Sequence, residues 1–464
     1  MNNRKNDIIE VLLLVFVIVC GCVIFLLEVQ SYEYFLYFCT VKRNICFFLR
    51  VPLCILMFFF GGVLPSFSDE ERVAPSKDID NVEISLLTCQ PHDEVYSLYG
   101  HTAIRVHNKL TGDDIAVNYG VFDPTIDFFV LRFIFGLTDY SMGICSYQDF
   151  LDEYKRWGCG VYEQRINMNK LQKQAFMDAL MRNARPENVV YRYNYFYNNC
   201  TTKARDIILE GVEIAPLTNN IGDTSAEVIC KRLSPLQQGK RSFRDLVRMK
   251  TADHPWAQWG NDLLLGVAAD ANTTYGEREF LPEVLAADFD ESRVVYHGSR
   301  WSKPLVDTAY WALQPGKPRK NPDDVNFPLS PFHVSLVALF VSIVFFILFE
   351  CFVIKKPLLL VHYSVCCLYA FIGIFIFLML FSQHPTVRVN FQILIFNPLF
   401  FIFALPKFMK GWGKYAILTS ILLFFAGNIL QTYAEGVNIL ALSLLITFAP
   451  FYFGKSKKNI NFAS

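Results

Sequence analysis

Neither sign of charge is in excess in this sequence: 43 lysine and arginine residues face 43 aspartate and glutamate residues, so the formal net charge is zero. Without a basic excess there is no electrostatic case for a nucleic-acid partner. Charged residues are also scarce, at 19% of 464 residues, against about 25% in soluble globular proteins. Hydrophobic residues reach 53%. These values exclude a disordered chain, a collagen-like repeat and a purely soluble enzyme.

Several widespread catalytic and metal-binding motifs are missing as well. The chain contains no HExxH zinc motif, no GxSxG serine elbow and no Walker A loop. No CxxC spacing occurs among its 13 cysteines, so a structural zinc site is not expected. We therefore expect no metal and no other cofactor.

Long apolar runs lie at the two ends of the chain and leave a polar middle from about Ser68 to about Asn326. This middle is long enough for one large domain or two small ones. We expect residues 69–313 to form an external domain. Residues 314–330 are rich in proline and are expected to form an extended linker.

Residues 331–454 are expected to form a bundle of five transmembrane helices. A spanning helix needs about 20 predominantly apolar residues, so the first two stretches are long enough and the last three are short. Lysines follow the first, third and fifth stretches, which places the tail 455–464 in the cytoplasm and the polar middle outside. The five stretches are Pro331–Ile354, Pro357–Phe381, Phe391–Leu405, Ala416–Leu430 and Val437–Phe453.

The N-terminal end holds two further apolar runs. The second lies within residues 45–68, follows Lys42 and Arg43, and precedes small residues, which is typical of a signal peptide or an anchor. Its direction agrees with an external middle domain. Residues 1–44 are either an extension upstream of the true start or an extra helix that goes against the charge rule.

The first part of the polar middle predicts a β-hairpin followed by helices, and hence an α+β domain. Gly100 allows a close approach directly before His101, which begins the first strand of the hairpin, and a Thr-Gly-Asp-Asp turn follows. The expected strands are Val82–Thr88, Ala103–Val106 and Ile115–Tyr119, and the expected helices are Lys170–Asn183 and Thr202–Glu210.

The most informative segment is Tyr191–Asp206, where an aromatic stretch leads to Cys200 and a helix then begins. A thiol at a helix N-terminus lies at the positive end of the helix dipole, which lowers its pKa and favours the thiolate. A thiolate is the competent nucleophile, and His101 at the start of a strand is its natural base. Asn118, on the return strand, is placed to orient the imidazole.

Each of these residues also has a simpler interpretation. A single cysteine is more often a small buried apolar side chain than a nucleophile, and a single histidine in a hairpin is more often structural. Asn199-Cys200-Thr201 also fits a glycosylation sequon. The pairing of Cys145 with Cys159 stays open, as does the choice between Asn118 and Tyr119 as the residue that orients the imidazole.

At these residues the sequence resembles the outer domain of the Lnb-type lipoprotein N-acyltransferases, over about Ile84 to Leu285. The order of histidine before cysteine also resembles the permuted papain-like thiol enzymes, which include relatives of the NlpC/P60 peptidases. The motifs that carry the resemblance are Tyr99-Gly100-His101-Thr102-Ala103, Asn118-Tyr119-Gly120-Val121-Phe122-Asp123, Phe133-Ile134-Phe135-Gly136, Asn199-Cys200-Thr201-Thr202-Lys203-Ala204-Arg205-Asp206, Trp259-Gly260-Asn261-Asp262-Leu263-Leu264-Leu265-Gly266 and Phe280-Leu281-Pro282.

The resemblance implies a permuted papain-like external domain followed by a five-helix transmembrane bundle, in a bacterial inner membrane with the external domain in the periplasm. It implies an acyltransferase that moves an acyl chain from a phospholipid to the N-terminal amine of diacylglyceryl-cysteine lipoproteins. Cys200 would be the nucleophile and His101 the base. The candidate substrate-binding residues are Tyr99, Tyr119, Arg105 and Arg205. The long N-terminal extension departs from the family pattern.

Two other functions compete with this one. A membrane-tethered papain-like cysteine hydrolase, acting on cell-wall peptide or on lipid, would use the same Cys–His pair. A non-enzymatic binding module would leave Cys200 and His101 far apart. Phe128–Leu137 is too short to span a membrane and is expected either to enter the interface as an apolar lid or acyl-chain guide, or to be buried core. Asn397-Pro398 is expected to break its helix.

Overall fold

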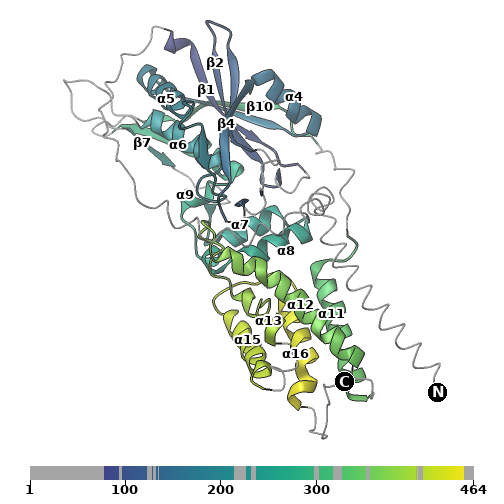
Figure 1. Ribbon diagram of the computed structural model, residues 1–464. Helices are drawn as coiled ribbons and strands as arrows, with labels where there is room; N and C mark the ends of the chain where they lie inside the picture. The colour runs from purple at the N-terminus through teal and green to yellow at the C-terminus, as the bar shows by residue number, and fades with distance from the viewer. Residues whose placement is uncertain are drawn as a thin grey trace. The chain divides into compact units, whose positions relative to one another are not determined.

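The computed structural model describes residues 78–92, 97–122, 128, 132–133, 135–213, 226–230, 237–296, 302–316, 327–351, 356–403, 405 and 411–453. All of these residues belong to the second of the two units into which the chain divides, Pro75–Ser464, and their elements are labelled in Figure 1. The expectations for residues 1–44, 45–68 and 455–464 lie outside the described residues. The described parts of the expected linker, 314–316 and 327–330, form neither helix nor strand.

A seven-stranded antiparallel sheet forms the centre of the outer domain, in the order β10-β5-β1-β2-β3-β4-β6. The predicted hairpin is confirmed as β2 and β3, which pair with Ala103 opposite Asn118. The strands are β1 (Val82–Cys89), β2 (His101–Asn108), β3 (Asp114–Val121), β4 (Asp139–Ser146), β5 (Val161–Ile166), β6 (Val190–Arg192) and β10 (Val306–Leu313).

The two faces of this sheet are covered by different helices. On one face, α5 (Lys170–Asn183) and α6 (Cys200–Val212) bury Leu86, Ile104 and Val117 in the largest core of the domain. On the other face, α4 (Tyr147–Trp157) packs over the sheet around Phe150 and Ala116. Because successive side chains of a strand point to opposite faces of the sheet, the same strands contribute apolar side chains to the cores on both faces. The two predicted helices are thus present as α5 and α6.

A smaller antiparallel sheet and several short helices complete the outer domain. The sheet contains β7 (Ala226–Cys230), β8 (Ser292–Tyr296) and β9 (Ser302–Pro304), in that order. The helices are the 3₁₀ turns η3 (Ile79–Asn81) and η6 (Val267–Asp270), and α7 (Phe243–Lys250), α8 (Pro255–Leu264), α9 (Tyr275–Arg278) and α10 (Pro282–Glu291).

The C-terminal part is apolar and helical. Two helices, α11 (Pro331–Cys351) and α12 (Lys356–Met379), are long and apolar enough to cross a membrane. Two more, α15 (Gly413–Gly427) and α16 (Val437–Phe453), are shorter. Helices α11 and α16 are joined by buried hydroxyl groups: Ser342 hydrogen-bonds Ser443 at 2.6 Å. Small polar residues of this kind are typical of helix contacts within membranes.

The expected count of five spanning helices is not confirmed. The third apolar stretch, Phe391–Leu405, is not one helix within its described residues, because it contains the 3₁₀ turn η7 (Phe391–Leu394) and the short helix α13 (Phe400–Phe403). The break falls at Asn397 and Pro398: a proline removes a helical N–H donor, and the Asn397 side chain accepts the Leu399 N–H instead, at 2.9 Å. The break expected at Asn397-Pro398 is thus present, and it explains why length and composition alone overcount the spanning helices.

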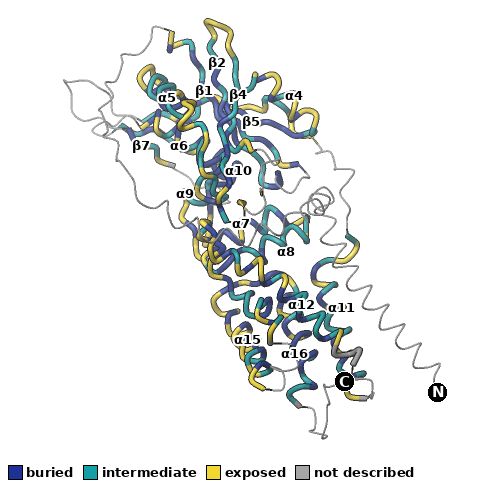
Figure 2. The backbone as a smooth tube through the Cα atoms, viewed as in Figure 1, coloured by how far each residue is buried: buried dark blue, intermediate teal, exposed yellow. Residues whose placement is uncertain are grey.

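Large apolar side chains are exposed on the outer surfaces of the bundle. Phe340 on α11 is 66% exposed and Leu422 on α15 is 57% exposed, and exposed positions recur along these helices in Figure 2. In water such a surface would be unfavourable, whereas in a bilayer it meets hydrocarbon. The inner surfaces pack against one another around Phe396, Phe424 and Phe448.

Candidate active site

Cys200 is the first residue of α6, and its position is fixed by the residue before it. The side-chain oxygen of Asn199 accepts the N–H groups of Thr201 and Thr202 at 3.0 and 2.9 Å, and Thr202 Oγ1 accepts the Asn199 N–H at 2.9 Å. This reciprocal pair is a capping box, which closes the start of the helix. Asn199 also donates to the carbonyl of Phe280 at 2.9 Å. The Asn-Cys-Thr sequence is therefore used here to place a thiol at a helix N-terminus.

His101 lies at the start of β2 because of the glycine before it. Gly100 has φ +76°, and a Cβ at this position would lie 2.7 Å from the Cys89 carbonyl oxygen. Only glycine fits there without a backbone shift. One residue further, Thr102 Oγ1 donates to Thr201 Oγ1 at 3.1 Å in a buried contact. This bond ties the start of β2 to the start of α6.

Gly120 provides the close approach between β3 and α6. Its φ is +86°, and it lies at an irregularity of the β3–β4 pairing between Asn118 and Val121. A Cβ at Gly120 would lie 3.6 Å from Cys200 Cβ. The space is thus sufficient for a methyl group, but the backbone conformation is not one that residues other than glycine readily adopt.

The structure brings Cys200, His101 and Asn118 together. Burial alone would raise the pKa of the Cys200 thiol, but the charge and hydrogen bond of His101, the Thr102 N–H and the Thr201 hydroxyl lower it to about 7. Burial alone would lower the pKa of His101, but Cys200 and Asn118 raise it above its usual value. His101 Nε2 lies 3.1 Å from Asn118 Oδ1. Asn118, and not Tyr119, therefore contacts the imidazole.

The low thiol pKa predicts the pH dependence of alkylation. Because iodoacetamide reacts with the thiolate, its rate at Cys200 in the full-length protein should be half-maximal near pH 7, rather than about pH 8.5 as for an ordinary thiol. In His101→Ala the thiolate loses its partner, so the midpoint should rise and the rate at pH 7 should fall at least about tenfold. Mass spectrometry of the Cys200 peptide measures both. A wild-type midpoint above pH 8.5 would show that the pair does not form.

Three tyrosines that were not singled out as site residues lie near Cys200. The Tyr193 ring comes within 3.7 Å, and the Tyr191 hydroxyl within 4.0 Å, of the Cβ position of Gly120, beside Cys200. Burial and the nearby Cys200 charge raise the pKa of Tyr191, Tyr193 and Tyr195, so all three stay neutral. These tyrosines occupy every second position of the aromatic stretch. This alternation is the sequence signal that places their side chains on the same side of the chain.

The two predicted tyrosines occupy different positions. The Tyr99 hydroxyl accepts from Asn261 Nδ2 at 3.0 Å, and its ring meets the Tyr195 ring edge-on at 5.2 Å. Tyr99 therefore lies between the site and α8. Tyr119 is only 1% exposed and packs in the core with its ring 6.3 Å from that of Tyr191. The structure thus brings Tyr99 toward the site and turns Tyr119 into the core.

The two predicted arginines are both held by carboxylates. Arg105 binds Asp114 at 2.6 Å and Glu163 at 3.0 Å, and it lies four residues along β2 from His101, about 13 Å at the usual strand rise. The structure does not bring it to the Cys–His pair. Arg205, on α6, binds Glu279 at 3.1 Å. It lines a surface groove beyond the first turn of the helix, together with Phe196, Tyr197, Thr202, Asp206 and Leu209.

Cys145 and Cys159 are not joined by a disulfide. Asn118 Nδ2 donates toward Cys145 Sγ at 3.6 Å, whereas Cys159 Sγ points to the carbonyl of Pro91 at 3.5 Å. Among the described residues, no cluster of three or more histidine, cysteine or acidic side chains is arranged to hold a metal ion. Cys145 thus contacts the residue that orients His101.

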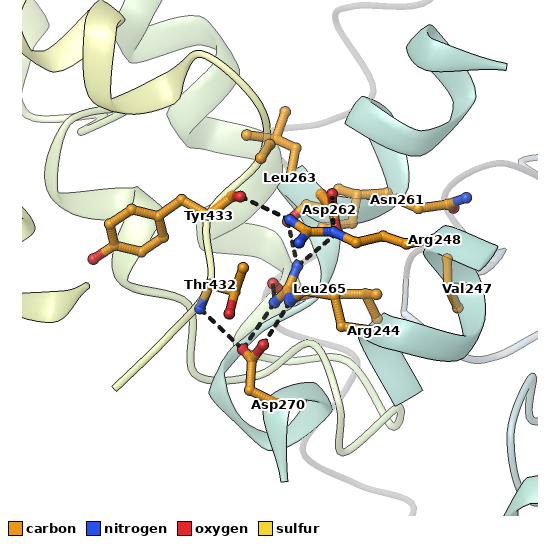
Figure 3. Close-up of polar contacts among 12 residues, drawn as sticks. Arg244, Val247, Arg248, Asn261, Asp262, Leu263, Leu265, Asp270, Thr432 and Tyr433 are labelled. Atoms are coloured by element: carbon orange, nitrogen blue, oxygen red, sulfur yellow. Dashed lines mark hydrogen bonds and ion pairs between the residues drawn. The ribbon is translucent and has the colours of Figure 1, made fainter. Parts of the chain in front are cut away.

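A buried ion cluster lies between the outer domain and the loops of the bundle (Figure 3). We call it the α8 clamp, and it consists of Arg244, Arg248, Asp262 and Asp270. Arg244 is 1% exposed and binds Asp262 at 3.1 Å and Asp270 at 2.8 Å. Arg248 binds Asp262 at 2.8 Å and donates to the Tyr433 carbonyl at 3.0 Å. The clamp thereby holds α7 and α8 against the loop between α15 and α16.

Backbone contacts extend the clamp to a second loop of the bundle. Gly266 N–H donates to Thr386 O and Val267 N–H donates to Val389 O, each at 2.8 Å. Gln392 Nε2 donates to the Asp262 carbonyl at 2.9 Å. The motif Trp259–Gly266 therefore joins the membrane loops to Tyr99, through Asn261, and so to the vicinity of Cys200.

The fold and site define a membrane protein whose outer α+β domain holds a paired cysteine and histidine. The family model of the Lnb N-terminal periplasmic domain matches residues 69–228, and that of the Lnb transmembrane domain matches residues 322–459. The chain belongs to the Lnb family. No curated protein and no solved structure matches it.

Family membership fixes the place and the general class of the protein. It is an inner-membrane protein with a periplasmic domain, and a lipoprotein-modifying enzyme of the acyltransferase type. The mixed helix and sheet fold, with a periplasmic domain before a transmembrane domain, agrees with the predicted class. The likeness to papain-like thiol enzymes stays a prediction.

Proposed function

We propose that this enzyme transfers an acyl chain from a membrane phospholipid to the free α-amine of the diacylglyceryl cysteine that begins a processed lipoprotein. The chain would be carried between the two as a thioester on Cys200. The observation that supports this most is the Cys200 thiol itself: it lies at a helix N-terminus beside His101, and its pKa is lowered to about 7. About half of such a thiol is ionised at neutral pH.

In the first step, the Cys200 thiolate attacks the ester carbonyl of the phospholipid. A C–S bond forms and the C–O bond to the glycerol breaks. Protonated His101 gives its proton to the departing glycerol oxygen, which leaves as the hydroxyl of a lysophospholipid. The Cys200 N–H, at the first position of α6, has no acceptor within the helix and is the candidate donor to the oxyanion.

In the second step, the neutral α-amine of the lipoprotein attacks the thioester carbonyl. A C–N bond forms, the C–S bond breaks, and the Cys200 thiolate is released. Neutral His101 takes the proton that the nitrogen loses, which restores the starting pair. Asn118 acts by holding the imidazole at 3.1 Å. Splitting the transfer in this way replaces one difficult displacement by two easier ones.

Two of the candidate substrate-binding residues retain a place in this proposal. Tyr99 contacts Tyr195 at the edge of the site, and Arg205 lines the groove one turn along α6. Both substrates are anchored in the membrane, so a site attached to the bundle through the α8 clamp meets them where they already are. Neither substrate then has to leave the bilayer completely.

The intact mass of the protein tests the proposal. After incubation with phospholipid vesicles, the wild-type mass should increase by one acyl group, located on Cys200 and released by hydroxylamine. Addition of a diacylglyceryl-cysteine peptide with a free amine should discharge it onto the peptide. Discharge only to water would identify a lipid hydrolase instead. Transfer that proceeds in rapid-quench samples without any adduct would exclude the thioester.

A further inference from the structure

The segment before β4 contacts the outer end of a membrane-spanning helix. Gln383 N–H donates to the Phe135 carbonyl at 2.9 Å, and the Phe133 ring centroid lies 6.3 Å from that of His384. The His384 ring also hydrogen-bonds the Phe133 backbone. Because α12 ends at Met379, these contacts lie where the bilayer ends and the periplasm begins.

Exposed apolar side chains lie on both sides of this contact. Phe133 is 40% exposed and Leu137 is 37% exposed, while Leu380 and Phe381 at the end of α12 are 41% and 64% exposed. The α12 residues belong to a surface that faces lipid. Since the segment that carries Phe133 is bonded to the same end of the helix, its exposed rings lie at the membrane interface, where aromatic side chains are favoured.

A second group of ring contacts lies beside Cys200. Beyond Leu137, Tyr140 lies on β4, and its ring centroid is 5.2 Å from that of Phe122. Tyr140 stacks on Tyr193 at 4.1 Å. The Tyr193 ring lies 3.7 Å, and Cys200 Cβ 3.6 Å, from the Cβ position of Gly120. We call four aromatic residues and the neighbouring Leu137 the aromatic track: Phe122, Phe133, Leu137, Tyr140 and Tyr193.

We propose that the aromatic track is the binding surface for the acyl chain of the donor lipid, along which the chain passes from the bilayer to Cys200. The inference rests on the proposed function and adds to it the residues that bind the donor. A methylene chain that leaves the bilayer exposes apolar surface to water unless another apolar surface covers it. The track offers apolar side chains at both ends of this path, with Phe133 at the end of α12 and Tyr193 beside the thiol. The aromatic rings lose little side-chain entropy on binding, because each has only two rotatable bonds.

Two acyl donors distinguish binding of a long acyl chain from the chemical step at the Cys200 thiol. The first is a dipalmitoyl phospholipid in vesicles of phosphatidylethanolamine and phosphatidylglycerol, and the second is the soluble short ester p-nitrophenyl butyrate. Full-length protein is reconstituted with each, and the initial rate of Cys200 acylation is measured by intact mass. Only the long chain needs the track, whereas both donors need Cys200 and His101.

We expect Phe122→Ser and Phe133→Ser each to lower the rate with the vesicle donor at least about tenfold, and the rate with the short ester less than about twofold. Phe133→Leu keeps the apolar surface and should restore the vesicle rate. Leu110→Ser is the matched control, because Leu110 is a 61% exposed apolar residue in the β2–β3 turn, outside the track. It should leave both rates unchanged.

Each other outcome has a distinct meaning. Equal losses with both donors would show a structural role and overturn the track. Unchanged vesicle rates in both serine variants would overturn it as well, while the proposed function stood. A wild-type protein that acquires no acyl group from either donor would overturn the proposed function together with the track.

Discussion

Cys200→Ser should lose acyl transfer by a factor on the order of 10⁴ or more while the protein still folds and inserts. A serine hydroxyl has nearly the same size as the thiol, so the capping box at Asn199 remains. It does not ionise near neutral pH, and neither His101 nor the helix dipole lowers its pKa enough to replace a thiol whose pKa is about 7. The measurement is N-acylation of a lipoprotein acceptor in vesicles, followed by mass spectrometry.

The same experiment includes its own controls. Cys367→Ser changes a half-buried cysteine of α12 and should retain full activity. His101→Ala should lose nearly as much activity as Cys200→Ser. The double variant should be no worse than the poorer single one, because the two residues act as a unit. Retention of more than a tenth of the wild-type rate by Cys200→Ser would contradict its role as the nucleophile.

Arg244→Leu should have the largest effect on stability. The substitution removes the buried guanidinium group from Asp270 and from Asp262, whose side chain is 1% exposed and which keeps only the partly exposed Arg248 as a partner. It also removes hydrogen bonds to the carbonyls of Asp262, Leu265 and Gly266. Removing one side of a buried ion pair costs about 3–5 kcal/mol. Thermal unfolding in detergent should therefore shift down by roughly ten degrees.

A surface pair provides the comparison for this effect. Arg182 and Glu210 also form an ion pair, but both side chains are more than a third exposed, and such pairs contribute about 0–1 kcal/mol. Arg182→Leu should thus unfold close to the wild-type temperature. Arg244→Lys should not rescue the clamp, because an ammonium group cannot reproduce the planar fork of bonds. Equal stability of Arg244→Leu and wild type would show that the clamp does not stabilise the junction.

The sequence predicted best those features of the fold and the site that depend on residues close together in the chain. The placement of Cys200 at a helix start depends on Asn199 and Thr202, which are its neighbours in the chain. The β2–β3 hairpin depends on the alternation of apolar and polar residues and on the turn between the strands. His101 and Asn118 could therefore be placed on adjacent strands from the sequence alone. Their contact with Cys200, about a hundred residues away, followed from chemical reasoning on the pair and a family resemblance.

The sequence did not reveal features that depend on distant partners. Arg105 was expected to bind substrate, yet Glu163 lies 58 residues further along the chain and binds its guanidinium group across the sheet. The α8 clamp joins Asp270 to Thr432, 162 residues apart. The third apolar stretch was counted as a spanning helix from its hydropathy, although the Asn397-Pro398 pair already indicated the break that the structure shows. For Arg105 and for the α8 clamp, the decisive partner lies too far along the chain for a local pattern to reveal it.

The attachment of Trp259–Gly266 to two separate loops of the bundle has a consequence for substrate selection. A domain joined at one point can rotate, whereas one joined at Thr386–Val389 and again at Thr432–Tyr433 is restrained against rotation about either point. The Cys200 site is therefore held in one orientation relative to the bundle. Under the proposed function, this favours an amine that begins a lipid-anchored chain over an amine on a freely diffusing peptide.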